Sequence, residues 1–211
     1  MKLKELHALM QDIAPFPNPK VELEQYPTGP HLASQLLFAV DSSYDELAGS
    51  TVVDLGCGTA MLSIGAALLG SRHVLGLDID AEALEVAGEN AAQYEEPLPI
   101  DFLLADVRQL PRQLPRLRAD VVIMNPPFGT KQKGVDLAFL RSAFHIATTS
   151  IYSLHKSSTR EFIAKTAKRE LGAGSAEVVA QLRYDLPATM KFHKQKSVDI
   201  EVDLWRFQVG A

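Results

Sequence analysis

The stretch Thr51-Val52-Val53-Asp54-Leu55-Gly56-Cys57-Gly58-Thr59-Ala60-Met61 decides the fold of this chain. Its first five residues are mostly apolar without alternation, which is typical of a parallel strand covered by helices on both faces. The two glycines that follow let the backbone turn tightly, and a helix is expected directly after them. Ligands bind at the carboxyl ends of strands in open α/β sheets, so this turn predicts a ligand site.

Working outward from this unit, apolar strands and amphipathic helices alternate along the rest of the chain. Strands that alternate with helices predict a doubly wound α/β fold with a mostly parallel, seven-stranded, Rossmann-like sheet. The last two strands have no helix between them, so the last strand should be antiparallel, and its alternating residues 197–204 predict one solvated face. We expect strands over 51–55, 73–78, 100–105, 119–124, 149–154, 178–184 and 197–207, and helices near 60–70, 81–93, 136–147 and 158–171.

Residues 1–50 precede the sheet and are expected to form a helical extension. One helix should cover residues 1–13, and a second should start after Pro30 and end in the loop 41–44. Three prolines between residues 15 and 19 make a stiff connector between them. We therefore divide the chain into an extension over 1–50 and a catalytic domain over 51–208, together forming a single domain.

The composition narrows the class of protein. The 211 residues are 46% hydrophobic and 22% charged, which are globular values. No apolar run approaches the roughly 18 residues of a membrane span, and the first residues do not form a signal peptide. A single cysteine, Cys57, excludes a disulfide framework and a multi-cysteine metal site. We expect an intracellular protein without a metal, located in the nucleus and cytoplasm, with the nucleolus as a further candidate.

Charge is distributed unevenly along the chain. Residues 1–110 contain five Lys and Arg against seventeen Asp and Glu, whereas residues 111–211 contain sixteen against nine. Such asymmetry hints at contact with a polyanion through the C-terminal half. Ordinary surface charge that happens to segregate is the alternative.

Acidic residues near the predicted strand ends indicate which ligand binds there. Asp78 ends the second strand, where a carboxylate can accept both ribose hydroxyls of an adenosine cofactor. Asp54 would repel a phosphate but suits the ammonium of a methionine moiety. Asp106, after the third strand, is assigned to the adenine amine, with a helix cap as its alternative. The predicted cofactor-binding residues of this loop region are Asp54, Gly56, Gly58, Thr59, Met61, Asp78 and Asp106.

The tetrapeptide Asn125-Pro126-Pro127-Phe128 follows the fourth strand and is the predicted catalytic element. Its prolines fix φ and hold the strand end rigid. An exocyclic amine is a poor nucleophile, but the Asn125 oxygen and the Pro126 carbonyl can each accept one of its N–H groups and orient it. Phe128 offers a face on which a planar base can stack. A Pro-Pro turn with Phe128 in the core is the alternative.

The glycine loop, Asp78, Asp106 and the tetrapeptide resemble class I S-adenosylmethionine-dependent methyltransferases over roughly residues 50–208. The resemblance implies S-adenosylmethionine as methyl donor and S-adenosylhomocysteine as product. Ala60 departs from the commoner Gly-x-Gly-x-Gly loop. We expect this departure to have little effect because a helix start tolerates alanine.

Three basic runs predict contact with a nucleic-acid backbone. They lie in the loops expected near the active site, although each alone could be a solvated loop. A base inside a duplex cannot reach such a site, so the target must be flipped out or unpaired. The predicted RNA-binding residues are Lys131, Lys133, His155, Lys156, Arg160, Lys191, Lys194 and Lys196.

Four further stretches narrow the resemblance to the methyltransferase-like protein 5 family, eukaryotic enzymes that make N6-methyladenosine in small-subunit (18S) ribosomal RNA. They are residues 23–28, 128–131 and 152–160, and residues 186–188 followed by 191–194. The resemblance implies that Gln25 and Thr28 close over the cofactor from the extension. It also implies a heterodimer with a small zinc-binding activator subunit.

The expected position of the third strand gives a physical reason to expect such a partner. In the usual strand order of the fold it is an edge, and in Ile100-Asp101-Phe102-Leu103-Leu104 the only charge is Asp101. A hydrophobic, unguarded edge favours pairing with another chain. We expect the activator to cover residues 100–105 by strand addition.

Other functions remain open at this level. The same tetrapeptide chemistry serves methylation of a glutamine amide in protein, or of another base amine. A non-enzymatic assembly scaffold is a further alternative, which the intact tetrapeptide disfavours.

Overall fold

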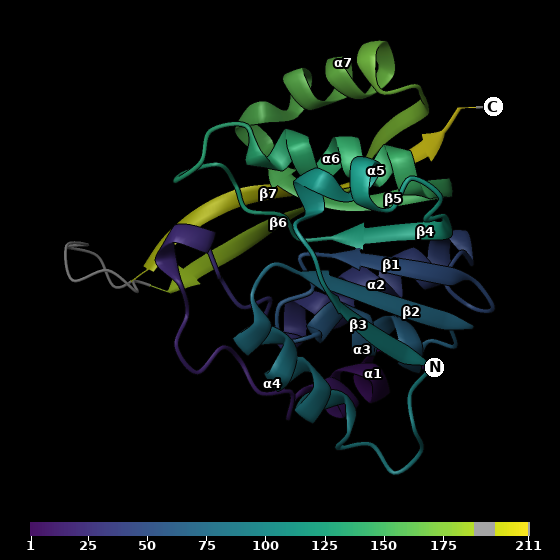
Figure 1. Cartoon of the computed structure of the whole chain (residues 1–211), viewed down its shortest axis with the longest axis vertical. Coiled ribbons are helices and arrows are strands. Elements are labelled where there is room, and N and C mark those ends of the chain that lie inside the picture. The colour runs from purple at the N-terminus through teal and green to yellow at the C-terminus, as the bar shows by residue number, and fades with distance from the viewer. Residues whose placement is uncertain (188–196, 211) are drawn as a thin grey trace.

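The computed structural model describes residues 1–187 and 197–210. Its strands form one seven-stranded sheet in the order β3-β2-β1-β4-β5-β7-β6, and only the pairings made by β7 are antiparallel (Figure 1). The predicted fold class and the antiparallel last strand are therefore confirmed. The strands are β1 (Thr51–Leu55), β2 (His73–Asp78), β3 (Ile100–Leu104), β4 (Ala119–Met124), β5 (Ala147–Lys156), β6 (Ala173–Pro187) and β7 (Ser197–Val209).

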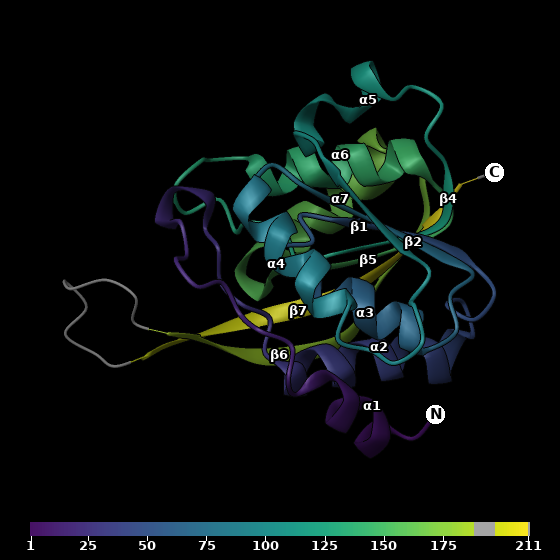
Figure 2. The same ribbon diagram turned by 60° about the horizontal axis from the view of Figure 1, so that its bottom comes forward.

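Helices cover both faces of this sheet, which explains why β1 and β4 are apolar on both sides (Figure 2). One hydrophobic core joins α1, α2, α3 and α4 to one face, and a second joins α5, α6 and α7 to the other. The short α5 was not predicted from the sequence. The helices are α1 (Leu3–Met10), α2 (Pro30–Tyr44), α3 (Met61–Leu68), α4 (Ala81–Ala91), α5 (Leu110–Gln113), α6 (Val135–Ile146) and α7 (Arg160–Glu170).

The strand order reverses between β1 and β4, and this reversal positions the ligand site. The chain first builds outward from β1 to β2 and β3, and then returns to add β4 on the other side of β1. In β1, Val52 pairs with Val121 and Asp54 pairs with Ile123 of β4. The segments that leave the carboxyl ends of β1 and β4 therefore start side by side, as expected at a topological switch point.

The N-terminal extension packs onto the first core instead of standing apart. Leu6 and Met10 of α1 and Leu37 of α2 are fully buried against α3. Gly65 of α3 permits this, because a Cβ at that position would lie 2.3 Å from Leu37 Cδ1 and 2.9 Å from Met10 Cε. The predicted end of α2 at residues 41–44 is wrong, since the helix continues to Tyr44 and is capped by Asp45 in the left-handed conformation.

The solvated face predicted for residues 197–204 is only partly present among the side chains that the structure describes. Glu201 is exposed, but Asp203 on the same face is buried, as are all of residues 202–207 of β7. Asp203 is held by Arg160, whose Nη2 and Nε donate to its two oxygens at 2.6 and 2.7 Å. Sequence alternation failed here because a polar side chain with a charged partner can alternate with apolar ones inside a protein.

Strand β3 forms one edge of the sheet, as predicted. Phe102 packs over Gly76 of β2, where a Cβ would lie 2.8 Å from its ring. Leu103 and Leu104 are 38% and 57% exposed, so the edge presents apolar side chains to solvent. Within the described part of the chain, no helix is long and apolar enough to cross a membrane.

Ala60 does not occupy an ordinary helix start, which corrects the expectation that alanine is tolerated there. It has φ 73° and ψ 21°, in the left-handed region, and directly precedes α3. For residues with a Cβ, this conformation costs roughly 1–2 kcal/mol. The turn therefore carries a backbone strain that glycine would relieve.

We predict that Ala60→Gly stabilises the protein by about 0.5–1 kcal/mol, because relief of the strain exceeds the added chain entropy of glycine in the unfolded state. Thermal and urea unfolding measure this change. Ala66→Gly, inside α3, is the matched control and should destabilise the protein by about 1 kcal/mol or more. A loss of stability in Ala60→Gly equal to that of the control would contradict the strain argument.

Candidate active site

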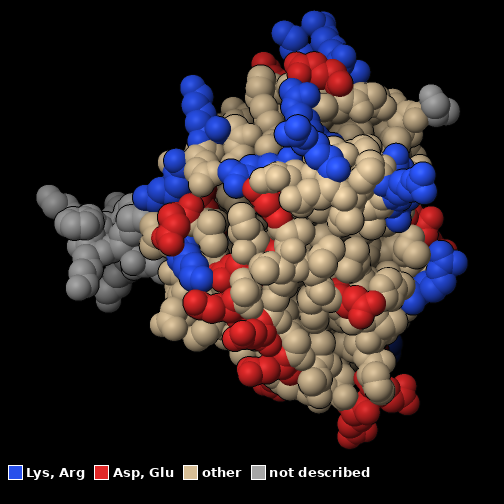
Figure 3. Space-filling view, in the orientation of Figure 1, with Lys and Arg blue, Asp and Glu red and all other residues tan. Residues whose placement is uncertain are grey.

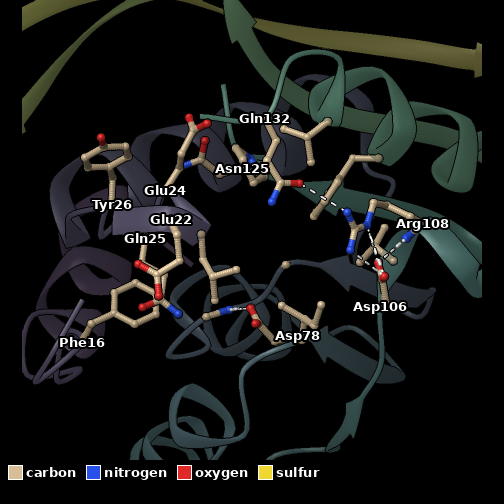
Figure 4. Close-up of a pocket in the computed structure, with 18 residues that line it drawn as sticks. Phe16, Glu22, Glu24, Gln25, Tyr26, Asp78, Asp106, Arg108, Asn125 and Gln132 are labelled. Atoms are coloured by element: carbon tan, nitrogen blue, oxygen red, sulfur yellow. Dashed lines mark hydrogen bonds and ion pairs between the residues drawn. The ribbon is translucent and has the colours of Figure 1, made fainter. Parts of the chain in front are cut away.

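A cavity lies where the carboxyl ends of the central strands face the segment between α1 and α2 (Figure 4). It encloses about 810 Å³ when the space open to solvent is counted. Phe16, Glu24, Gln25 and Tyr26 form one wall, and residues at the strand ends form the other. A second cavity adjoins it and shares Phe16, Tyr26, Gly56, Gly58 and Asn125.

The glycine turn after β1 forms the floor of both cavities. Gly56 and Gly58 have φ of 70° and 54°. A Cβ on Gly58 would lie 2.6 Å from the Phe16 ring, and one on Gly56 would lie 2.9 Å from the Phe139 ring. Glycine is required here both by the backbone conformation and by the close approach of the two rings.

Asp78, at the end of β2, is bound to the glycine turn. Its Oδ2 accepts the Gly58 N–H at 2.9 Å and its Oδ1 accepts the Asp80 N–H at 2.9 Å. Burial raises the pKa of Asp78, and these backbone hydrogen bonds oppose that rise. The carboxylate lines the first cavity, where a ligand hydroxyl can reach it.

Asp54 is a buried carboxyl beneath the same turn, with an exposed fraction of 1%. Its Oδ2 accepts a hydrogen bond from Ser63 Oγ at 2.6 Å. Its Oδ1 has no hydrogen-bond partner among the described residues. Burial raises its pKa to about 7, against the opposing hydrogen bond from Ser63, and the negative charge of Asp78 adds to the rise. A buried acceptor without a partner is costly, so Asp54 is suited to a cationic or hydrogen-donating ligand in the second cavity, which it lines.

Asp106 caps a helix, which was the alternative to its predicted contact with the adenine amine. Its Oδ1 accepts the Arg108 N–H at 3.0 Å, which caps the 3₁₀ helix η2 (Val107–Gln109). Its carboxylate also pairs with the Arg108 guanidinium at 2.8 Å, and this arginine holds the pKa of Asp106 below its usual value. The residue lines the first cavity, but the guanidinium already occupies much of its acceptor capacity.

The predicted catalytic tetrapeptide leaves the end of β4 beside this turn. Asn125 lines both cavities and Pro127 lines the first. Asn125 Nδ2 donates to Thr28 Oγ1 at 2.8 Å, so the extension orients the Asn125 amide. Phe128 is half-buried against the first core, with Lys156 Nζ lying 6.0 Å from its ring centroid.

The extension is tied to the start of α4, which brings Gln25 over the cavity. Gln25 Nε2 donates to Asp80 Oδ2 at 2.7 Å, and Gln25 Oε1 accepts the Lys20 N–H at 2.7 Å. Lys20 Nζ also pairs with Asp80 Oδ1 at 2.7 Å. The sequence analysis missed Lys20 and Asp80. Asp80 carried a signal, because an aspartate before a helix is a typical N-cap.

The remaining predicted cofactor residues lie on the second cavity. Thr59 and Met61 both line it, one on each side of Ala60. Asn90 of α4 fixes the turn there, because its Nδ2 donates to Thr59 O at 2.9 Å and to Ala14 O at 3.0 Å. Asn90 is a supporting residue that sequence reasoning did not identify.

The predicted RNA-binding residues separate into distinct groups. Lys131 and Lys133 are exposed in the loop after the tetrapeptide, and Lys156 is half-buried beside Phe128. Arg160 is exposed but its guanidinium is engaged by Asp203. Three of the predicted residues lie outside the described residues: Lys191, Lys194 and Lys196.

The prediction that His155 contacts RNA is wrong. It is 1% exposed and contacts Ser153 Oγ through Nε2 at 2.9 Å inside the protein. Burial lowers its pKa to about 4, with Asp203 opposing that shift. The sequence placed this histidine in a basic run, but β5 extends to Lys156 and holds His155 inside the sheet.

Positively and negatively charged side chains gather over helices on different faces of the sheet (Figure 3). Lys and Arg gather over α5, α6 and α7, whereas Asp and Glu gather over α4. The charge asymmetry along the chain is therefore an asymmetry in space. Among the side chains that the structure describes, no group of three or more His, Cys, Asp or Glu is arranged to hold a metal ion.

Comparison with known proteins assigns the family. The rRNA N(6)-adenosine-methyltransferase METTL5 of Danio rerio is 48% identical over 98% of this chain and 99% of its own length. The chain belongs to the METTL5 family. A candidate RNA methyltransferase of Pyrococcus horikoshii has the same fold, with 36% identity and a TM-score of 0.83 over 100% of this chain and 97% of that one.

Two further matches concern the part of this METTL5 family member that contains the glycine turn. The model for ribosomal protein L11 methyltransferase (PrmA) matches residues 26–126, which include the glycine turn and end within the tetrapeptide. A magnesium protoporphyrin IX methyltransferase of Synechocystis, solved with bound S-adenosylmethionine, has the same fold at 20% identity and a TM-score of 0.57, covering 82% of this chain and 76% of that one. The relatives show that the chain is a methyltransferase, as the resemblance implied.

Proposed function

We propose that this METTL5 family member transfers a methyl group from S-adenosylmethionine to N6 of an adenosine in small-subunit (18S) ribosomal RNA. The observation that carries the proposal is the position of Asn125, which lines both cavities next to the glycine turn. An amine held by the tetrapeptide would thereby face the methyl donor. The proposal also assigns the protein to the nucleus and cytoplasm, including the nucleolus, where such RNA is made and used; cell fractionation tests this location.

The residues of the two cavities fit S-adenosylmethionine. The buried Asp54 Oδ1 has no partner among the described residues, and we assign it to the cofactor's ammonium. Asp78 is assigned to the ribose hydroxyls and Asp106 to the region of the adenine. Thr59 and Met61 line the second cavity together with Asp54, and we assign them to cofactor contacts there. When bound, the cofactor supplies an activated methyl group on a sulfonium.

We also assign separate roles to the two parts of the chain. We assign residues 51–208 to catalysis and residues 1–50 to closing the cofactor site. Gln25 is held to Asp80, and Thr28 accepts from Asn125. These contacts support a role for the extension in organising the site as well as covering it.

Catalysis in this proposal is mainly orientation. The Asn125 oxygen and the Pro126 carbonyl each accept one N–H of the adenine amine, which directs its lone pair at the methyl group. The two prolines keep these acceptors rigid. Phe128 contributes an aromatic face beside Lys156, so a base stacked there would lie near a cation.

We assign the RNA backbone to the basic surface beside the tetrapeptide. The described residues best placed for phosphate contact are Lys131, Lys133 and Lys156. We also assign phosphate contacts to three lysines outside the described residues: Lys191, Lys194 and Lys196. Methylation of a protein glutamine amide needs no such surface. Binding that weakens steeply with salt would favour RNA over that alternative.

The apolar edge of β3 is assigned to the small zinc-binding activator subunit. Leu103 and Leu104 are exposed there, and edge strands with apolar side chains invite pairing. We propose that the partner adds a strand along residues 100–105, which would bury both leucines.

We predict that Asn125→Ala lowers methylation by about 10²–10³-fold, because one preorganised polar contact to the reacting group is lost. Its affinity for S-adenosylmethionine should stay close to wild type. The assay is mass spectrometry of N6-methyladenosine in purified 18S and large-subunit RNA taken from cells that lack the protein and then treated with each variant. Unchanged N6-methyladenosine in 18S RNA after wild-type treatment would overturn the proposed substrate.

We predict that cofactor affinity rises with pH. Asp54 must be ionised to bind an ammonium, and its pKa is about 7 before the ligand binds. Affinity for S-adenosylmethionine should therefore be about tenfold weaker at pH 6 than at pH 8, with proton release on binding at low pH. Isothermal titration calorimetry measures both effects. Asp54→Asn should bind weakly at every pH; a variant that kept the wild-type pH dependence would exclude Asp54 as its source.

We predict that Leu104→Lys abolishes complex formation with the activator, since a charge at this edge opposes burial. Phe162→Lys is the matched control, because Phe162 is 53% exposed on α7, and α7 packs against β6 at the opposite edge of the sheet. Co-purification and size-exclusion chromatography compare the variants. A stable complex with Leu104→Lys would place the partner elsewhere.

A further inference from the structure

Glu24 is a buried acid in the wall of the first cavity that the proposed chemistry has not used. It follows the 3₁₀ helix η1 (Val21–Leu23) and adopts the left-handed conformation, with φ 53° and ψ 43°. Its exposed fraction is 6%, whereas Glu22 two residues earlier is exposed. The left-handed turn thus directs one acid of this segment inward while its neighbour remains in solvent. Figure 4 shows Glu24 among the side chains around the cavity, together with Asn125.

The two oxygens of Glu24 have different environments. Oε1 accepts the Lys131 N–H at 2.7 Å, which joins the extension to the loop after the tetrapeptide. Oε2 is buried and has no hydrogen-bond partner among the described residues. A purely structural latch would need only Oε1. A second, buried acceptor without a partner is costly and indicates a ligand group that completes it.

Glu24 is also tied to the catalytic residue through its own segment. Thr28, four residues on, accepts from Asn125 Nδ2 at 2.8 Å. The segment 24–28 therefore contacts the tetrapeptide at one end and the loop after it at the other. Glu24 is thereby held on the side of the cavity where the amine of the target base would lie.

The proposed reaction leaves a proton that must be removed. Once an amine has formed a bond to the methyl carbon, its nitrogen is positively charged and must lose a proton. The amide oxygen of Asn125 and the carbonyl of Pro126 can accept hydrogen bonds, but they are too weakly basic to take this proton. Three other described acids line this cavity: Asp106 is paired with Arg108, Asp78 is bound to the glycine turn, and Glu22 is exposed to solvent.

We propose that Glu24 is a further catalytic residue, whose Oε2 accepts the proton released by the adenine amine. This rests on the proposed N6-adenosine methylation. The nitrogen–carbon bond forms as the carbon–sulfur bond breaks, and the electron pair of the broken bond stays on sulfur. After this bond has formed, the N–H that was held by the Asn125 oxygen turns to Oε2, and its proton moves to Oε2 and later to solvent. The products are N6-methyladenosine, S-adenosylhomocysteine and one proton.

Two titratable side chains lie close enough to Glu24 to be affected by its charge when it is ionised. Burial raises the pKa of Tyr26, and the charge of Glu24 adds to the rise. Burial likewise raises the pKa of Asp136, with Lys156 opposing the rise and Glu24 contributing to it. Lys131 contacts Glu24 through its backbone, and its ammonium side chain is exposed.

Glu24→Gln separates proton transfer from structure, because glutamine keeps an oxygen for the Lys131 N–H but cannot take a proton. We expect the single-turnover rate on 18S RNA to fall about 100-fold. The melting temperature and the affinity for S-adenosylhomocysteine should be unchanged. Glu85→Gln is the matched control and should keep the wild-type rate, because Glu85 is exposed on α4 and lines neither cavity. A Glu24→Gln rate within threefold of wild type would overturn the proposal, and so would an equal loss of cofactor affinity, which would make Glu24 structural.

A second variant makes the test independent of Glu24→Gln. Glu24→Ala leaves a small cavity, and added formate should restore part of its rate while leaving Glu24→Gln unaffected. Absence of this rescue would assign Glu24 to the latch with Lys131 alone.

A binding measurement distinguishes failure of this proposal from failure of the proposed substrate. Sinefungin carries an ammonium in place of the transferable methyl group, close to where the charged amine would form. Glu24→Gln should weaken sinefungin about tenfold relative to S-adenosylhomocysteine, with no RNA present. If wild type does not methylate 18S RNA but this difference appears, the substrate assignment is wrong and the charge role of Glu24 stands. An equal effect on both ligands would overturn that role.

Discussion

The parallel pairing of β1 with both β2 and β4 is the constraint on which the site depends. Because Asp54 pairs with Ile123, Gly56 and Asn125 follow at the same level, two residues beyond the paired positions. Asp78 ends β2 on the other side of β1. The glycine turn, the acid of β2 and the tetrapeptide of β4 are thereby brought together by backbone hydrogen bonds, before any side chain contributes.

This arrangement collects buried acids at one end of the sheet, which the fold must stabilise. Backbone N–H groups bind Asp78, and Ser63 binds one oxygen of Asp54. Asp54 and Glu24 each retain an oxygen without a partner among the described residues. Buried polar groups normally have hydrogen-bond partners. We therefore assign these two oxygens to the cationic group of the cofactor and to the proton-donating amine of the target base.

The N-terminal extension links the cofactor side of the site to the acceptor side. Gln25 reaches the start of α4, Thr28 reaches Asn125, and Glu24 reaches the loop after the tetrapeptide. Apart from the basic residues beside the tetrapeptide, Lys and Arg gather over α5, α6 and α7. These helices cover the opposite face of the sheet from α1, α2, α3 and α4. The tetrapeptide stands between the two, which suits an enzyme that must hold a small cofactor on one side and a polyanion on the other.

The sequence by itself determined the strand–helix alternation, the glycine turn, Asp78 and the tetrapeptide, because these depend on local periodicity and on residues within a few positions of one another. Even the edge position of β3 followed from the usual strand order. Contacts between distant segments were decided only by the tertiary structure. Asp203 and His155 look solvent-facing in sequence but are buried, since their partners come from elsewhere in the chain. Glu24 and Lys131, 107 positions apart, meet only because the extension folds back across the strand ends, a long-range packing that no local pattern encodes.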